Sequence, residues 1–230
     1  MPELDSDEVE KVRMVLDYLG HELEPSILIG GWATYLRVGG DISYDVDLIV
    51  GSPEVRSRVR GAVQGVSESH HLQGKKWRGS VDGVHVDLYL PHESELGGKL
   101  RLKVEVLAKF TEAVPDGPWR LLTLEAHTIS KFAALLDRPD TEKGFKDARE
   151  IARLLELGVD AQGASAILAE ATAGGRGDLR GHIARVFDLL GPRAGLNKEQ
   201  RRRLARIRRE WDDAIAGAVA HVGTTRPLQI

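Results

Sequence analysis

Cysteine is absent from this chain of 230 residues. Disulfide bonds, thiolate metal sites and cysteine nucleophiles are therefore excluded. The sequence also lacks an apolar run long enough to cross a membrane, and its acidic N-terminus lacks the apolar core of a signal peptide. We therefore expect a cytoplasmic protein with no membrane partner. The formal charge of only −3 argues against bulk attraction to nucleic acid, but a local basic patch is compatible with it.

The composition is that of an ordinary folded domain. Hydrophobic residues make up 42% of the chain and charged residues 29%, so disorder is not expected. A chain of this length can form one large domain or two small ones, and either can bury a real core.

Hydrophobic spacing predicts a mixture of helices and strands in the first half of the chain. Helices are expected over about 7–19, 31–38 and 53–66, and strands over 26–29 and 44–50. The dipeptide Asp82-Gly83 is typical of a two-residue turn, which predicts a hairpin within 71–90. The alternation over 100–107 predicts one further, half-exposed strand.

The second half has apolar positions at helical spacing only. Helices are expected over 124–136, 145–157, 161–172, 179–190 and 197–222, with breaks at Pro139, Gly158, the glycines 174–175 and the dipeptide 191–192. The predicted fold class is therefore α/β (α+β). A core domain with an N-terminal helix and a small mixed sheet would occupy residues 1–117, a C-terminal helical bundle residues 118–222 and a tail residues 223–230.

Two aspartates on an apolar stretch are the main chemical signal. Asp45 and Asp47 are two residues apart on a predicted strand, so their side chains share one face. Paired carboxylates repel each other unless a cation lies between them, and oxygen ligands suit Mg²⁺. The upstream pair Gly30-Gly31 would let the backbone approach a phosphate closely. The alternative is a pair of surface acids on an edge strand.

A third carboxylate, Asp87, lies on another apolar strand. It is either an isolated, satisfied acid or, if its strand lies beside residues 44–50, a third ligand on the same face. Three such carboxylates are typical of two-metal phosphoryl transfer, with one of them bridging the ions.

These motifs resemble those of the DNA-polymerase-beta-like nucleotidyltransferase superfamily. Residues 129–138 and 146–151 resemble the "K-x-x-A-L-x-x-R … K-D-x-x-D-I" helices of AbiEii/MenT-type toxins within it. The resemblance covers roughly residues 26–157, and Glu150 stands where this branch often has Asp. It implies the metal ligands Asp45, Asp47 and Asp87.

The resemblance implies roles for Lys131, Asp147 and Ser43, and Arg138 is a further candidate. Lys131 would neutralise triphosphate charge, although it could simply extend from an apolar helix. Asp147 would orient Lys131 or the acceptor, and Arg138 would either cap its helix or contact phosphate. Ser43 would lie beside the triphosphate, where a kinase-like antitoxin phosphorylates the hydroxyl in some members. The plain alternative for Ser43 is an exposed serine at the start of a strand.

Two basic segments are further candidates. Lys76 and Arg78 lead into the predicted hairpin, either as a solvated edge or as phosphate ligands. The last helix is arginine-rich, and its arginines are either its wet face or a contact for an RNA backbone. The RNA candidates on this helix are Arg201, Arg202, Arg206 and Arg209.

The sequence thus predicts transfer of a nucleoside monophosphate from an NTP to an acceptor hydroxyl, with Mg²⁺ or alternatively Mn²⁺. The two halves would form the walls of the site. The residues expected to be catalytic are Asp45, Asp47, Asp87, Lys131 and Asp147. The resemblance implies a toxin with a cognate antitoxin, acting on the 3′ end of tRNA. The alternatives are a small-molecule (antibiotic) or protein nucleotidyltransferase, or a non-catalytic nucleotide-binding module.

Overall fold

The structure is a computed structural model that describes residues 6–71, 74–114, 117–172 and 178–223. The chain divides into two compact units. The first comprises residues 1–96 and 103–123, and the second comprises residues 97–102 and 124–230. Each unit is described by itself.

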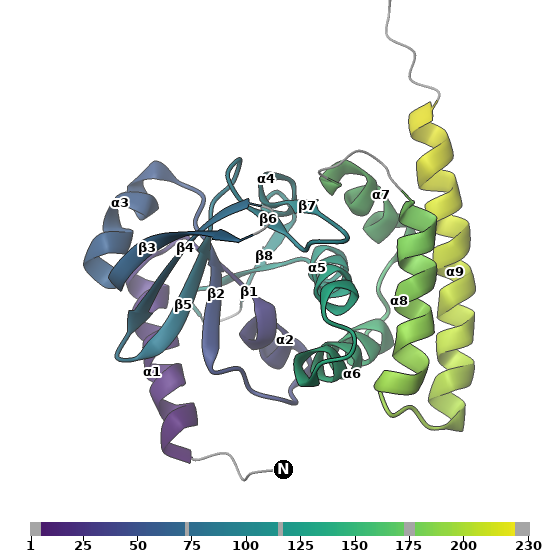
Figure 1. Cartoon of the computed structure of the whole chain (residues 1–230), viewed down its shortest axis with the longest axis horizontal. Helices are drawn as coiled ribbons and strands as arrows, with labels where there is room; N and C mark the ends of the chain where they lie inside the picture. Colours follow the sequence, from purple (N-terminus) through teal and green to yellow (C-terminus); the bar gives the residue numbers. More distant parts are fainter. Residues whose placement is uncertain (1–5, 72–73, 115–116, 173–177, 224–230) are drawn as a thin grey trace, which may run out of the picture. The chain divides into compact units, whose positions relative to one another are not determined.

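A seven-stranded mixed sheet forms the centre of the first unit (Figure 1). Its spatial order is β3-β4-β5-β2-β1-β9-β8. Strands β2 and β5 pair in parallel, as do β1 and β9, and the other neighbours are antiparallel. The strands are β1 (Ile27–Ile29), β2 (Asp45–Ile49), β3 (Gln64–His71), β4 (Gly74–Val81), β5 (Val84–Tyr89), β8 (Thr111–Ala113) and β9 (Arg120–Leu122).

One face of this sheet is the core of the first unit. Val46, Leu48, Val86 and Leu88 alternate along β2 and β5 and are fully buried. Helix α1 packs against these two strands, since its own apolar stripe belongs to the same cluster. The helices of this unit are α1 (Ser6–Glu22), α2 (Gly30–Val38), α3 (Pro53–Ala62) and α4 (Val104–Leu107). Because the alternating valines and leucines of β2 and β5 lie on the buried face, the residues between them lie on the opposite face of the sheet.

Three predicted boundaries in the first unit are wrong. The helix expected over 53–66 ends at Ala62, because the backbone is already extended at Val63 and continues as β3. The strand expected over 100–107 is only β7 (Leu102–Lys103), followed by α4, since period-two valines also satisfy an i, i+4 helical spacing. The short strands β6 (Glu95–Leu96), β8 and β9 were not expected. Residues 118–123 belong with the sheet, because β9 pairs with β1.

From Leu124 onward, the described part of the second unit is helical, as predicted (Figure 1). Breaks occur at Pro139 and Gly158 as expected, whereas Pro192 lies inside a helix that continues to Arg193. The predicted break at 174–175 and most of the predicted tail lie outside the described residues. The helices are α5 (Leu124–Asp137), α6 (Glu142–Glu156), α7 (Ala161–Ala171), α8 (Leu179–Arg193) and α9 (Lys198–Gly223).

An aromatic cluster lies in the core of the second unit. Trp211 on α9 packs against Phe132 on α5, with ring centroids 5.0 Å apart, and against Phe187 on α8 at 6.2 Å. These contacts join three helices, and α8 and α9 run side by side in Figure 1. The carboxylate of Asp137 accepts hydrogen bonds from the backbone N–H groups of Gly98 (2.7 Å) and Lys99 (2.8 Å), which fixes residues 97–102 to this unit. In the described part of the chain, no helix combines the length and apolar character that crossing a bilayer requires.

Candidate active site

The register of two neighbouring strands brings the three aspartates onto one face. Asp47 on β2 is directly opposite Asp87 on β5, and Asp45 is opposite His85. Directly opposite residues in a sheet project to the same side, and so do residues two apart on a strand. We call this surface of β2 and β5 the acid face. It is the side opposite the buried valines and leucines.

Gly30 allows the backbone to approach one of these acids closely. It follows β1 directly and begins α2, with a φ of +69° that L side chains rarely adopt. A Cβ at this position would collide with the carboxylate of Asp47. The carboxylate therefore lies beside the first turn of α2, where the helix dipole favours negative charge. Gly31, the second glycine of the motif, is buried in the same turn.

Ser43 contacts the acid face directly. Its hydroxyl Oγ donates a hydrogen bond to Oδ1 of Asp45. Ser43 therefore lies beside an acid of this face, and a group attached to its hydroxyl would be in contact with the carboxylate of Asp45.

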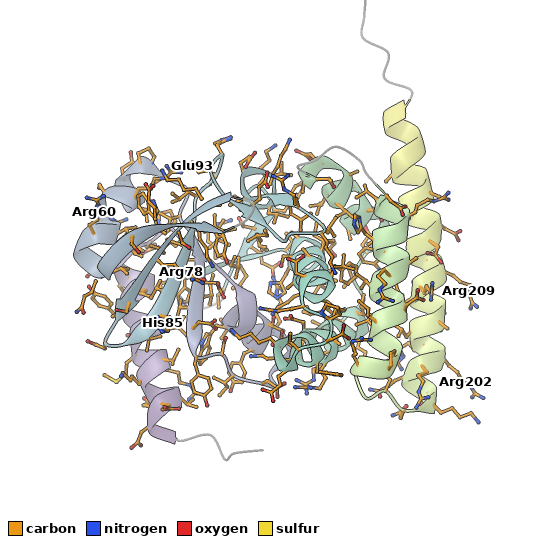
Figure 2. The ribbon with its side chains drawn as sticks, in the orientation of Figure 1. Arg60, Arg78, His85, Glu93, Arg202 and Arg209 are labelled. Carbon is orange, nitrogen blue, oxygen red and sulfur yellow. The ribbon has the colours of Figure 1, made fainter. Side chains whose placement is uncertain are left out.

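Asp87 is held by two cations from the adjacent strand β4. Nζ of Lys76 lies 2.5 Å from Oδ2, and Nε of Arg78 donates to Oδ1 at 2.9 Å. The Lys76 side chain is only 13% exposed, whereas that of Arg78 is 49% exposed. Figure 2 labels Arg78 on the strands of the first unit. The hydrogen bond and charge of Asp87 raise the pKa of the Arg78 guanidinium.

Tyr89 also belongs to the acid face, and the sequence reasoning missed it. It lies two residues beyond Asp87, and Nζ of Lys76 is 5.4 Å from the centre of its ring. Desolvation, with the nearby charges of Asp47 and Asp87, raises the pKa of its phenol well above the ordinary value. The phenol therefore stays protonated at neutral pH. The same two-residue spacing that selected the aspartates would have selected Tyr89.

Asp45 and Asp47 fit a divalent cation by their chemistry. They are hard oxygen donors that project from one strand face, as Mg²⁺ requires. Both oxygens of Asp87 are engaged by Lys76 and Arg78. Within the described residues, no three acidic or histidine side chains are grouped closely enough to hold a metal. A three-carboxylate site would thus require Asp87 to exchange its cationic partners.

The second unit contains a separate group of charges, which we call the buried ion cluster: Lys131, Asp147 and Glu150. All three are at most 5% exposed. Nζ of Lys131 lies 2.6 Å from Oε2 of Glu150 and 3.5 Å from Oδ1 of Asp147. Arg138 closes the cluster by donating two hydrogen bonds to Asp147, at 2.7 and 3.1 Å. The structure therefore brings together three predicted residues and adds Glu150.

In this cluster, the neighbouring cations do not fully offset the effect of burial on Glu150. Burial raises the pKa of Glu150, while the neighbouring Lys131 and Lys146 oppose the rise. Nζ of Lys146 is 3.8 Å from Oε1 of Glu150. The role of Lys131 toward a nucleotide stays a prediction, because its ammonium group here serves two carboxylates of its own unit.

The arginines of α9 fall into two groups. Arg201 donates to the backbone oxygen of Leu196, and Arg206 lies within 4.0 Å of Glu210. All four candidate arginines are exposed, and Figure 2 shows Arg202 and Arg209 projecting from α9 on the side away from α8. They lie seven residues apart, which is two helical turns, so they share one side of the helix.

Comparison with known proteins gives structural likeness only. No family model matches the sequence, and no curated protein does. Two structures of the antibiotic-resistance factor ANT(2'')-Ia are 17% and 19% identical, with TM-scores of 0.46 and 0.49. They cover 72% and 73% of this chain and 97% and 92% of theirs, and one of them is a complex with adenylyl-2''-tobramycin.

Two further solved structures have lower TM-scores. An antigenic nucleotidyltransferase-like protein from Paracoccidioides brasiliensis is 18% identical, with a TM-score of 0.37, and covers 68% of this chain and 79% of its own. The CCA-adding enzyme of Thermotoga maritima, complexed with tRNA, is 12% identical with a TM-score of 0.31, and covers 90% of this chain and 58% of its own. None of these names is that of an AbiEii/MenT toxin. Because these identities are all below 20%, the likeness concerns the fold alone, and any function must be inferred from the side chains of the acid face.

Proposed function

We propose that this protein is a metal-dependent nucleotidyltransferase that transfers a nucleoside monophosphate from an NTP to an acceptor hydroxyl and releases pyrophosphate. The observation that carries the proposal is the register of β2 and β5, which aligns Asp47 with Asp87 and puts Asp45 on the same face. Beside this face, α2 begins at Gly30. Because this residue has no Cβ, the backbone N–H groups at the start of the helix can receive a phosphate.

In this proposal the chain's own residues bind and orient the substrates. Asp45 and Asp47 would hold Mg²⁺ or Mn²⁺, and Asp87 would become a third ligand by exchanging its contacts with Lys76 and Arg78. The metal, when bound, neutralises triphosphate charge and favours ionisation of the acceptor hydroxyl. The backbone at Gly30 and Gly31 positions phosphate by its N–H groups.

The buried ion cluster has a proposed part in the same reaction. We assign to Lys131 the neutralisation of triphosphate charge and to Asp147 the orientation of Lys131. The 3.5 Å contact between their charged atoms supports the second assignment. Arg138 shares Asp147 with Lys131, so it would steady the acid when the lysine turns to phosphate.

We further propose that the acceptor is the 3′ end of tRNA and that the protein acts as the toxin of a bacterial toxin–antitoxin system. Support comes from the resemblance of residues 26–157 to AbiEii/MenT-type toxins and from the outward-facing Arg202 and Arg209 on α9, which suit a phosphate backbone. Addition to this end would block aminoacylation and halt translation. A cognate antitoxin would bind the protein or phosphorylate Ser43.

The test is incubation of the full chain with total tRNA, Mg²⁺ and each labelled NTP in turn. We expect one NTP to label tRNA, and expect Asp47→Asn to remove the label. A matched control is Asp82→Asn, because Asp82 lies in the hairpin turn with a φ of +48°, a conformation that asparagine adopts readily. That control should label tRNA as the unchanged protein does.

Two outcomes would contradict the proposal in different ways. Pyrophosphate release with a small-molecule or protein acceptor but not with tRNA would retain the enzyme and overturn the acceptor. NTP binding without pyrophosphate release, with every acceptor class, would overturn the enzyme itself.

A further inference from the structure

The two cations on Asp87 differ from ordinary surface ion pairs. Lys76 comes from the neighbouring strand with its side chain 13% exposed, and its Nζ lies 2.5 Å from a carboxylate oxygen. Arg78 engages the other oxygen, so both oxygens of Asp87 already accept charge-assisted hydrogen bonds. Asp45 lies on β2, two strands from β4 in the sheet.

We propose that Lys76 and Arg78 are exchangeable counter-cations of Asp87. They neutralise the carboxylate until a divalent cation takes it, and they then pair with the phosphates of the nucleotide. The inference rests on the proposed function and deepens it, because it assigns to β4 the coupling between metal binding and triphosphate binding.

The physical reason is the cost of buried charge. The carboxylate of Asp87, whose side chain is 19% exposed, requires a cationic partner, and the ammonium group of Lys76, whose side chain is 13% exposed, requires an anionic one. When a divalent cation binds Asp87, the ammonium group of Lys76 lies next to positive charge and requires a new anion. The phosphates of an NTP supply that anion. Binding of the metal alone is therefore opposed by Lys76, whereas binding of metal with nucleotide is favoured by it.

The lysine can move without leaving its place in the sheet. Its stem has flexible torsions, and the ring of Tyr89 lies beneath the ammonium group at 5.4 Å from the centroid. The ring can keep a favourable contact with the cation through a short displacement. The side chain of Arg78 is 49% exposed, so it is less confined than that of Lys76.

The consequence is an opposite effect on two affinities when Lys76 is replaced by an uncharged side chain of similar length. For Lys76→Met, we expect Mn²⁺ alone to bind about tenfold more tightly, as expected for the loss of one charge-assisted hydrogen bond that competes with the metal. We expect Mg²⁺ with a non-hydrolysable α,β-methylene NTP to bind about tenfold more weakly. A general loss of structure would weaken both.

The experiment uses calorimetry on the full chain to measure the binding of Mn²⁺ alone and the binding of Mg²⁺ with a nucleotide. The nucleotides are the α,β-methylene analogues of ATP, GTP, CTP and UTP, each in turn. The matched control is Lys75→Met, because Lys75 is the adjacent lysine on β4 and pairs instead with Glu68 at 2.8 Å. Its two affinities should equal those of the unchanged protein. Lys76→Arg should restore the pattern, and circular dichroism should show that all variants are folded.

The outcomes separate this inference from the proposed function. If Asp47→Asn loses Mn²⁺ binding while Lys76→Met changes neither affinity, the exchange is overturned and the enzyme stands. If Lys76→Met weakens both affinities while remaining folded, Lys76 only positions Asp87 and the exchange is again overturned. If Asp47→Asn binds Mn²⁺ as the unchanged protein does, both proposals fail.

Discussion

Replacing Lys131 by methionine tests the buried ion cluster. The substitution keeps the length of the side chain and removes the ammonium group that lies 2.6 Å from Oε2 of Glu150. Asp147 keeps its two hydrogen bonds from Arg138. Glu150 is therefore the group that loses its principal partner, with Lys146 remaining at 3.8 Å.

The magnitude follows from the two responses open to Glu150. If it stays charged, a buried ion that loses its partner costs about 3–5 kcal/mol of the free energy of unfolding. If it takes up a proton, the cost at pH 7 is set by its ordinary pKa of 4.5, at about 1.4 kcal/mol per pH unit, or about 3.4 kcal/mol. The cheaper response limits the loss, so we expect about 3 kcal/mol at pH 7.

The sign of the pH dependence is fixed by the direction of the pKa shift. The pKa of Glu150 is already raised by burial, and loss of Lys131 raises it further. An acid whose pKa is higher in the folded protein contributes stability below its pKa in the unfolded chain, which is 4.5 for Glu150. That contribution is lost as the pH rises through the pKa in the folded protein. The difference between the variant and the unchanged protein should therefore shrink to about 1 kcal/mol at pH 5.

The assay is urea unfolding followed by circular dichroism at pH 5, 6 and 7. Adding Glu150→Gln to Lys131→Met should recover most of the loss at pH 7, because a neutral amide needs no cation. Lys143→Met, at an exposed lysine of α6, should change stability little. A loss of stability in Lys131→Met that is equal at all three pH values, or that Glu150→Gln leaves unchanged, would refute the reasoning.

Two further predictions concern the acid face. Gly30→Ala should lower stability by more than the roughly 1–2 kcal/mol of a strained φ, because its methyl group meets the carboxylate of Asp47. Gly39→Ala has a similar φ of +63° and open space around its Cβ, so it should show the backbone strain alone, and equal losses in the two variants by urea unfolding would contradict the close approach. Ser43→Asp should weaken nucleotide binding and transfer by at least about tenfold, since its carboxylate replaces a donor to Asp45 with a like charge. Ser43→Ala should retain most of the transfer in the labelled-NTP assay, and equal activity of Ser43→Asp and the unchanged protein would exclude this hydroxyl as a control point.

The parts of the fold that the sequence predicted are those with a strong local period. The helices from Leu124 onward were found within a few residues of their observed ends, because their apolar stripes repeat over several turns. Strands β8 and β9 have three residues each, which is too short for a period, and only their partners in the sheet define them. Non-local pairing also placed residues 118–123 with the sheet.

The sequence predicts the acidic residues of the candidate site, but it does not predict which carboxylates the basic residues contact. Asp45, Asp47 and Asp87 have a local two-residue spacing or an apolar strand around them, so sequence reasoning reached them. The contacts of Lys76 with Asp87 depend on the register between β4 and β5, which the sequence leaves open. A lysine near a predicted hairpin carries no sign of which carboxylate it will meet.

The aromatic cluster gives the second unit a spectroscopic signal of its own. Of the four tryptophans in the sequence, Trp32, Trp77 and Trp119 belong to the first unit, and Trp211 to the second. The indole of Trp211 is fully buried, and its N–H has no hydrogen-bond partner among the described residues. Its emission should therefore shift to longer wavelength when water reaches it. With the other three tryptophans replaced by phenylalanine, fluorescence would follow the helical unit alone, and its comparison with the circular-dichroism transition of the whole chain would reveal whether the two units unfold together or in sequence.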